Sequence, residues 1–235
     1  MKDDQEKRGF EDFIDIIEEL TCRMSKHHHS HRRMKKSENY CDDLAWKSKL
    51  MTGYGVSVVL TVNLKGCADF SSVQKAMDAV PNLSPTRTLI IVDSGTYREK
   101  VTVCATKTNL IIQGQDYLNT TINDTANSTG GTPFSYTIAI LSTNFVTYNI
   151  SFQNTAPPLS PNAIGAQAVA LSILDDKAAF CGCGFYEAHD ALNDDSGRHY
   201  FKECFIQGSI KLIFGNGRSL YKDWVINSIA KEVSI

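Results

Sequence analysis

The chain has 235 residues, of which 42% are hydrophobic and 21% are charged, as is usual for a globular protein with one main domain. No stretch approaches the roughly 20 consecutive apolar residues that cross a bilayer, which excludes an integral membrane protein. The net charge of -2 provides no overall positive potential that would favour binding of nucleic acid. Neither a membrane nor a nucleic acid is therefore expected as a partner.

Residues 1–53 carry many charges of both signs and are expected to form an extension, partly helical or disordered. Apolar residues at helical spacing predict one amphipathic helix over residues 8–22, with its apolar stripe docked on the main domain. These residues are Phe10, Phe13, Ile14, Ile17 and Leu20. The histidine-rich segment 27–33 is flanked by Lys and Arg, which repel cations, so we expect a solvated basic segment and no metal site there. The charged amino terminus has no apolar stretch of the kind that a signal peptide requires.

Residues 54–235 read as the main domain, in which short β-branched runs alternate with Gly, Asn, Asp and Pro. The runs predicted as strands are VSVVLTV, TLIIVD, NLIIQG, TIAIL, FVTYNISF, AVALSIL, HYFKECFI, LIFG and SLYKDWVI. One helix is predicted over Phe70–Val80, with Pro81 ending it.

Cysteines and glycosylation motifs give weaker signals. The seven cysteines include no CxxC pair, so neither a zinc site nor a disulfide framework follows from their spacing. Five Asn-x-Ser/Thr sequons hint at a secreted glycoprotein. They begin at Asn82, Asn119, Asn123, Asn127 and Asn149.

An internal repeat indicates how these strands are arranged. The pattern Phe180-x-x-Cys183-x-Phe185 recurs 21 residues later from Phe201 and again 20 residues after that from Tyr221. Inward apolar residues on short strands with polar turns favour a parallel β-helix, in which residues one period apart stack on adjacent rungs. Asp190 and Lys211 are also 21 residues apart and are expected to be neighbours.

At these residues the chain resembles the plant pectin methylesterases (pectinesterases). The resemblance is carried by DFSSVQKAMDAVP, GTYREKV, NISFQNTA, GAQAVAL, CGFYEAHDAL, SGRHYFKECFIQGSI and FGNGRSLY. It implies an all-β fold, a right-handed, single-stranded parallel β-helix of the pectin lyase-like class. It also implies a secreted, monomeric protein of the cell wall that hydrolyses pectin methyl esters to pectate and methanol without metal or organic cofactor.

The resemblance assigns roles to individual residues. Asp190 matches the family's acid/base, and Gln167 matches one of two oxyanion-binding glutamines. His189 stands where the second glutamine is expected, and Lys211 stands at the position of the aspartate nucleophile. The family's Gly-Arg-Pro-Trp block, whose Arg orients the nucleophile, has no counterpart in this sequence.

Aromatic residues are candidates for a groove that binds sugar rings. Phe134 and Tyr186 are the main candidates, whereas Tyr97 and Phe185 fit either the groove or the core. Trp224 continues the inward repeat and is expected in the core.

The substitution at position 211 predicts loss of turnover. A lysine amine is ordinarily protonated near pH 7, and an amide formed by its attack would be stable. Lys211 should form a salt bridge with Asp190 and hold it ionised, which spoils the acid as well. Two alternatives to a weakened enzyme stay open. One is a non-catalytic β-helix that binds pectin, and the other is a truncated product that is unstable because its last rungs are missing.

Overall fold

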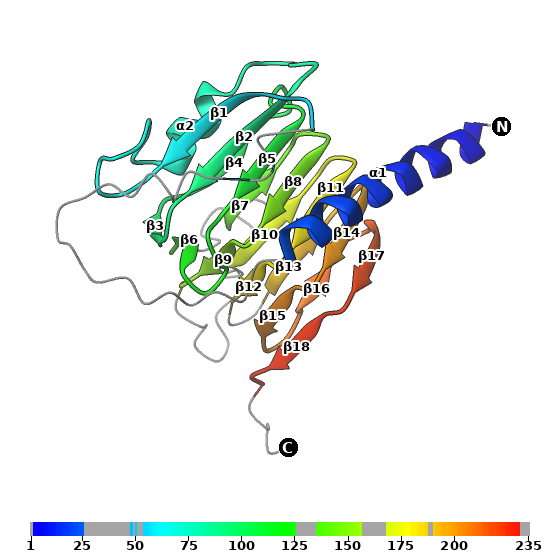
Figure 1. Ribbon diagram of the computed structural model, residues 1–235. Helices are drawn as coiled ribbons and strands as arrows, with labels where there is room; N and C mark the ends of the chain where they lie inside the picture. The colour runs from blue at the N-terminus through cyan, green and yellow to red at the C-terminus, as the bar shows by residue number, and fades with distance from the viewer. Residues whose placement is uncertain are drawn as a thin grey trace, which may run out of the picture.

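The computed structural model describes residues 2–25, 48, 50, 54–125, 135–156, 168–187 and 190–230. In this part of the chain, two helices and eighteen strands are present, and the strands form three parallel sheets. From β2 onward the chain visits the three sheets in turn and returns to the first one rung further along, which is a right-handed parallel β-helix (Figure 1). The expected fold is confirmed.

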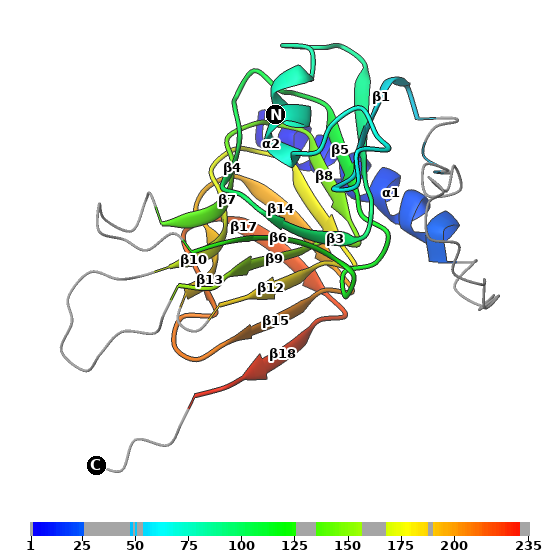
Figure 2. The ribbon, with the colours of Figure 1, turned by 90° about the vertical axis from the view of Figure 1, so that its left-hand side faces the viewer.

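The seven-stranded sheet is formed by β1 (Val56–Val62), β2 (Arg87–Val92), β5 (Leu110–Gln113), β8 (Phe145–Tyr148), β11 (Ala178–Cys181), β14 (Arg198–Lys202) and β17 (Arg218–Lys222). The six-stranded sheet is formed by β3 (Gly95–Arg98), β6 (Thr120–Asp124), β9 (Ser151–Asn154), β12 (Gly184–Tyr186), β15 (Phe205–Gly208) and β18 (Val225–Ser228). The five-stranded sheet is formed by β4 (Val101–Val103), β7 (Tyr136–Ile140), β10 (Val169–Ile173), β13 (Asp190–Asp194) and β16 (Ile213–Phe214). Figure 2 shows the six-stranded sheet as a regular ladder of strands.

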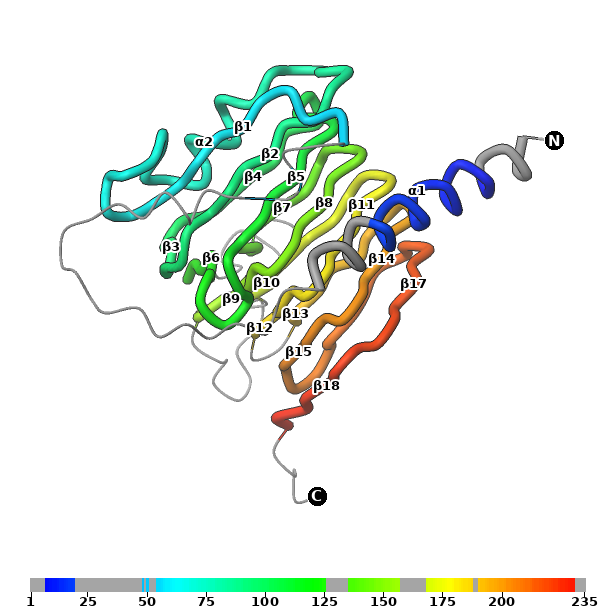
Figure 3. The backbone as a smooth tube through the Cα atoms, viewed as in Figure 1, coloured from blue at the N-terminus to red at the C-terminus, as the bar shows by residue number. Residues whose placement is uncertain are grey.

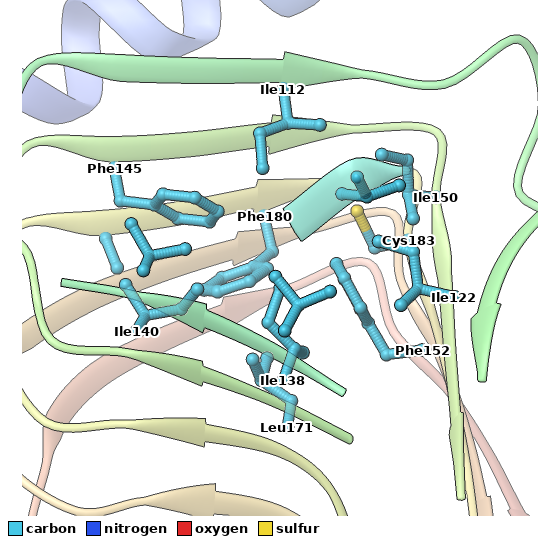
Figure 4. Close-up of a cluster of buried hydrophobic side chains, with 14 of the residues drawn as sticks. Ile112, Ile122, Ile138, Ile140, Phe145, Ile150, Phe152, Leu171, Phe180 and Cys183 are labelled. Carbon is cyan, nitrogen blue, oxygen red and sulfur yellow. The ribbon is translucent and has the colours of Figure 1, made fainter. Parts of the chain in front are cut away.

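The interior is filled by apolar side chains from all three sheets, which point toward one another (Figure 4). The sequence repeat marks this interior. Phe180 pairs with Phe201, and Phe201 with Tyr221, so their rings stack on successive rungs with centroids 4.9 and 4.8 Å apart. The Phe205 N–H donates to the Cys183 carbonyl, which aligns β15 with β12. The rung assignment of the repeat is confirmed.

Three runs that were predicted as single strands are each broken into two. FVTYNISF, HYFKECFI and SLYKDWVI turn a corner between the seven-stranded and six-stranded sheets at Asn149, Glu203 and Asp223. Each of these residues has a φ between 53° and 56°, in the left-handed region. Gly182 makes the same turn on the intervening rung with a φ of 60°. The repeat Phe-x-x-Cys-x-Phe therefore spans a corner, with its two aromatic residues on different sheets.

The short helix α2 (Val73–Ala79) begins later than the sequence predicted. Ser72 is its N-cap, and its side chain accepts a hydrogen bond from the Lys75 N–H at 3.2 Å. The Glu99 carboxylate also accepts the N–H groups of Val73 and Gln74 at 2.7 and 3.0 Å. Phe70 instead bridges to Val62 as extended chain, which explains why the helix does not start there.

The amino-terminal helix α1 (Lys2–Ser25) lies across the outer face of the seven-stranded sheet (Figures 1 and 3). Phe13 and Ile17 are buried against apolar residues of that face, among them Val146 and Tyr148. The predicted docking is confirmed, although the helix is longer at both ends than residues 8–22. Neither described helix has an apolar segment long enough to cross a membrane.

Cys67 is disulfide-bonded. Among the other described cysteines, Cys104 is exposed, whereas Cys181, Cys183 and Cys204 are buried. The histidine-rich segment 27–33 and Asn127 lie outside the described residues.

Candidate active site

Asp190 begins β13 at the corner between the six-stranded and five-stranded sheets. It is 3% exposed, and its backbone N–H donates to Oε2 of Glu187 at 2.6 Å. Glu187 is itself 5% exposed, and its own N–H donates to the carbonyl of Gln207 on the next rung. Two acidic residues are therefore buried at one corner, with Glu187 fixing the backbone from which Asp190 projects.

Lys211 lies on the rung after Asp190. The register pairs Leu192 with Ile213, and Asp190 and Lys211 each precede these residues by two positions. The Lys211 side chain is exposed, whereas that of Asp190 is buried. Within the described ranges, no ion pair joins Lys211 to Asp190, so the expected salt bridge is not formed here.

Three of the residues assigned from the sequence lie outside the described part of the chain. They are Phe134, Gln167 and His189, and their roles stay predictions. The residue that pairs with Asp190 on the preceding rung is Val169, which in turn pairs with Tyr136.

Tyr136 and Glu187 were missed by the sequence reasoning. Tyr136 is partly buried, with the Lys100 ammonium 4.3 Å from its ring centroid. Tyr136 precedes Val169 by 33 residues, the same spacing that separates Ile150 from Cys183, so that longer period could have placed it in this column. Glu187 lies at the corner between β12 and β13, where the sequence repeat of the strands does not extend.

The aromatic candidates separate clearly by burial. Tyr186 is partly buried on β12, and its ring centroid lies 5.4 Å from that of Phe205 on the next rung. Burial raises the pKa of Tyr186, although a hydrogen bond with Ser151 opposes this, so its phenol stays neutral near pH 7. Tyr97 and Phe185, at 1% and 0% exposed, belong to the core.

A second polar cluster lies at the other end of β13. The Asp194 carboxylate contacts Nδ1 of His199 and accepts the Tyr221 hydroxyl, both at 2.5 Å. Nε2 of His199 lies 2.8 Å from the carbonyl oxygen of Asp175. The side chains of His199 and Asp194 are 0% and 6% exposed, so this pair is buried and has a structural role.

The chemistry available at the corner is limited. A buried carboxyl group at position 190 can exchange a proton with a bound substrate, and the exposed amine at position 211 can attract an anion. The residue at position 211 is a lysine and not a second carboxylate. No group of three or more metal-binding side chains gathers anywhere in the described ranges.

The chain is similar to known proteins in sequence. The sequence model of the family Pectinesterase matches residues 59–232. An Arabidopsis thaliana protein assigned as pectinesterase 14 is 48% identical over 225 residues, which cover 95% of this chain and 64% of that protein. A second Arabidopsis thaliana protein, assigned as pectinesterase 8, is 47% identical over 85% of this chain and 51% of its own length.

Solved structures show the same likeness. Pectin methylesterase from carrot is 36% identical, with a TM-score of 0.66 over 74% of this chain and 53% of the carrot chain. Pectin methylesterase from Aspergillus niger is 31% identical, with a TM-score of 0.61 over 72% of this chain and 56% of that chain. The chain thus spans between about half and two thirds of the length of the proteins that it matches.

Proposed function

This chain belongs to the pectinesterase family, and from that premise we propose that its ligand is the homogalacturonan of the plant cell wall. The reaction it inherits is hydrolysis of the methyl ester, which gives pectate and methanol. We propose further that this chain performs the reaction very weakly or not at all. It remains a β-helix that binds pectin. Residues 54–235 form this β-helix, and residues 1–53 are an extension to it.

The family reaction needs two carboxyl groups in different roles. One attacks the ester carbonyl as a carboxylate and forms an acyl-enzyme, while the other gives a proton to the departing methanol. Water then cleaves the acyl-enzyme, and the second group takes the proton back. Asp190 supplies the second role, and Glu187 holds its backbone in place. Gln167 and His189 are assigned to binding the oxyanion that forms when the ester carbonyl is attacked.

The observation that carries the proposal is the residue on the rung after Asp190. The register puts Lys211 there, with an exposed side chain. A lysine amine is ordinarily protonated near pH 7 and has no lone pair for attack on an ester. If it did attack, the product would be an amide that water does not cleave on this timescale. Turnover stops in either case.

The same observation favours binding as a second function. Demethylated homogalacturonan is a polyanion, and the exposed ammonium group of Lys211 offers a charge of the opposite sign at the site. Tyr186 ends β12, just before the corner that holds Asp190, and its partly exposed side chain suits contact with a sugar face. A pectin-binding protein without turnover uses both features.

Localisation in the cell wall is part of the proposal. The disulfide at Cys67 supports it, because disulfides persist in oxidising compartments. We propose a secreted, monomeric protein that uses no metal or organic cofactor. A fluorescent fusion observed in plasmolysed plant cells tests the location, since label that retracts with the protoplast would contradict it.

The first prediction concerns turnover. Methanol release from methylated pectin is expected to fall on the order of 10⁴-fold below that of an active family member, because the covalent nucleophile is absent. Folding of the sample is checked by circular dichroism. A rate within tenfold of the active enzyme would contradict the proposal.

Binding is tested separately, by retention on immobilised, demethylated pectin. Lys211→Gln is expected to reduce retention, whereas Lys65→Gln, which removes an exposed lysine on the first rung, is expected to leave it unchanged. An equal loss from both variants would mean that binding reflects overall charge and not this site.

A further inference from the structure

The structure separates the sequons of this chain by their surroundings, and the function proposed above uses none of them. Four of the five asparagines lie on described residues, namely Asn82, Asn119, Asn123 and Asn149. An attached glycan needs an asparagine whose side chain can reach solvent without leaving a contact that the fold requires. Asn119 meets this condition most fully, because its side chain is exposed and makes no hydrogen bond among the described residues.

Asn119 lies on a tight turn at the corner between β5 and β6. Its N–H donates to the carbonyl of Asp116 at 3.0 Å, and the Leu118 N–H donates to Oδ1 of Asp116 at 2.9 Å. The Asn119 carbonyl accepts the Gly95 N–H at 2.8 Å, so the backbone is held from both sides. The side chain is exposed, and in the described ranges its amide makes no hydrogen bond.

The hydroxyl residue of this sequon is also accessible. Thr121 is partly exposed, and it points to the outer face of the six-stranded sheet because the next residue, Ile122, is buried in the core. Leu118, the neighbour of Asn119, is 68% exposed, so the surface around the asparagine is open.

Asn149 is the opposite case. It lies at the corner between β8 and β9, where its φ of 56° is in the left-handed region. Its Oδ1 would lie 2.7 Å from a Cβ at Gly182, and its carbonyl 2.3 Å from a Cβ at Gly114. A glycan on this side chain would have to displace the corner, so folded protein that carries it is disfavoured.

The other two are intermediate. Oδ1 of Asn82 accepts the hydroxyl of Thr106 at 3.0 Å, and the hydroxyl residue of its sequon, Ser84, is 9% exposed and donates to the carbonyl of Thr86. Asn123 is partly buried within β6, where its neighbours in the register are Arg98 and Gln153.

We propose that Asn119 is the N-glycosylation site among these four residues. Nδ2 of Asn119 attacks the anomeric carbon of an oligosaccharide carried on a polyprenyl pyrophosphate. A carbon–nitrogen bond forms, the bond from sugar to phosphate breaks, Nδ2 loses a proton, and the polyprenyl pyrophosphate leaves. This transfer takes place in the endoplasmic reticulum, so its occurrence in the native tissue rests on the secretory route proposed above.

The glycan would leave the candidate active site open. Asn119 stands at the corner between the seven-stranded and six-stranded sheets, whereas Asp190 stands at the corner between the six-stranded and five-stranded sheets. The modification therefore adds a hydrophilic cover near Leu118 without blocking a polysaccharide at Asp190.

The test expresses the full chain behind a cleavable secretory signal in a eukaryotic host. All variants carry Asn127→Gln, because that sequon lies outside the described residues. Purified, folded protein is treated with an amidase that releases N-glycans in heavy-oxygen water, and mass spectrometry locates each asparagine converted to labelled aspartate. Asn119→Gln is compared with the matched controls Asn82→Gln and Asn149→Gln.

We expect label on Asn119 in most molecules, loss of the glycan mass in Asn119→Gln, and no loss in the two controls. An unmodified Asn119 would overturn the inference if a co-expressed secreted glycoprotein were modified in the same cells. Folded protein with its glycan on Asn149 would overturn it as well. Methanol release plays no part in this experiment, so the proposed function and the glycan site can fail independently.

Discussion

At the scale of single residues, Asp194 ties three strands together. It lies at the end of β13, contacts His199 on β14, and accepts the hydroxyl of Tyr221 on β17. Burial raises the pKa of Asp194, but the hydrogen bonds from His199 and Tyr221 lower it more, so the folded pKa lies below its usual value. The carboxylate form is therefore the one that stabilises the fold.

The sign of the pH dependence follows from that shift. A carboxyl group with a lowered folded pKa stabilises the protein fully above its unfolded pKa of about 3.9, and the effect is lost as the pH falls through the folded pKa. We expect Asp194→Asn to cost about 2 kcal/mol at pH 7 and to flatten the loss of stability between about pH 5 and 3. Urea unfolding at several pH values measures both effects.

Asp195→Asn is the matched control, because it changes the adjacent carboxylate outside the cluster. It should leave the free energy of unfolding at pH 7 within about 0.5 kcal/mol of the unchanged protein. If Asp194→Asn and the unchanged protein lost stability in parallel on acidification, the pH dependence would have to come from other groups.

Prediction from sequence succeeded at residues that follow the period of the rungs. The 21-residue step placed Lys211 beside Asp190, and the structure has them on adjacent rungs. The burial of Glu187 and Asp190 was not predicted. Both residues lie at a corner between sheets, and no periodic sequence pattern specifies how the backbone turns there. The left-handed turn at Glu203 was hidden for a related reason, since glutamate gives no turn signal of the kind that glycine or asparagine gives.

At the scale of elements, α1 shows how a spacing pattern becomes a contact. Ile17 is 1% exposed against the seven-stranded sheet, whereas Ile16, its neighbour in the chain, is 39% exposed. The 3.6-residue period of the helix explains the difference, and it is the period that predicted the docking. The sequence did not indicate which sheet would receive the helix.

This difference supplies a prediction with an internal control. Ile17→Ala is expected to lower the free energy of unfolding by about 2–4 kcal/mol, because it leaves a cavity under the helix. Ile16→Ala removes the same atoms from a largely exposed site and should cost less than about 1 kcal/mol. Urea unfolding measures both. Equal effects would mean that α1 is not docked in solution as it is in the structure.

At the scale of the whole molecule, burial varies along the stack of rungs. All residues of β10 and β11 are buried, whereas all residues of β18 are exposed. In a stack where each rung contacts only its neighbours, stability is approximately a sum of local terms. Rungs with few buried contacts are then expected to open first.

Hydrogen exchange can test that gradient. Amides of β10 and β11 are expected to exchange at least tenfold more slowly than those of β18, since their opening requires several rungs to separate. Mass spectrometry of peptides from each strand gives the order. Uniform protection from β10 to β18 would show that the molecule opens as one cooperative unit.

The docked helix α1 has a consequence for the order of folding. Glu18 accepts hydrogen bonds from Tyr200 and from Lys222, and the second of these contacts joins residues 204 positions apart in the chain. Such a contact cannot form until the intervening rungs have brought β14 and β17 into place, because closing so long a loop early is costly in entropy. The helix α1 is synthesised before β14 and β17, and it is expected to dock only after these strands have formed the surface that receives it. During that wait its apolar stripe is uncovered, and a newly made chain is most open to aggregation then.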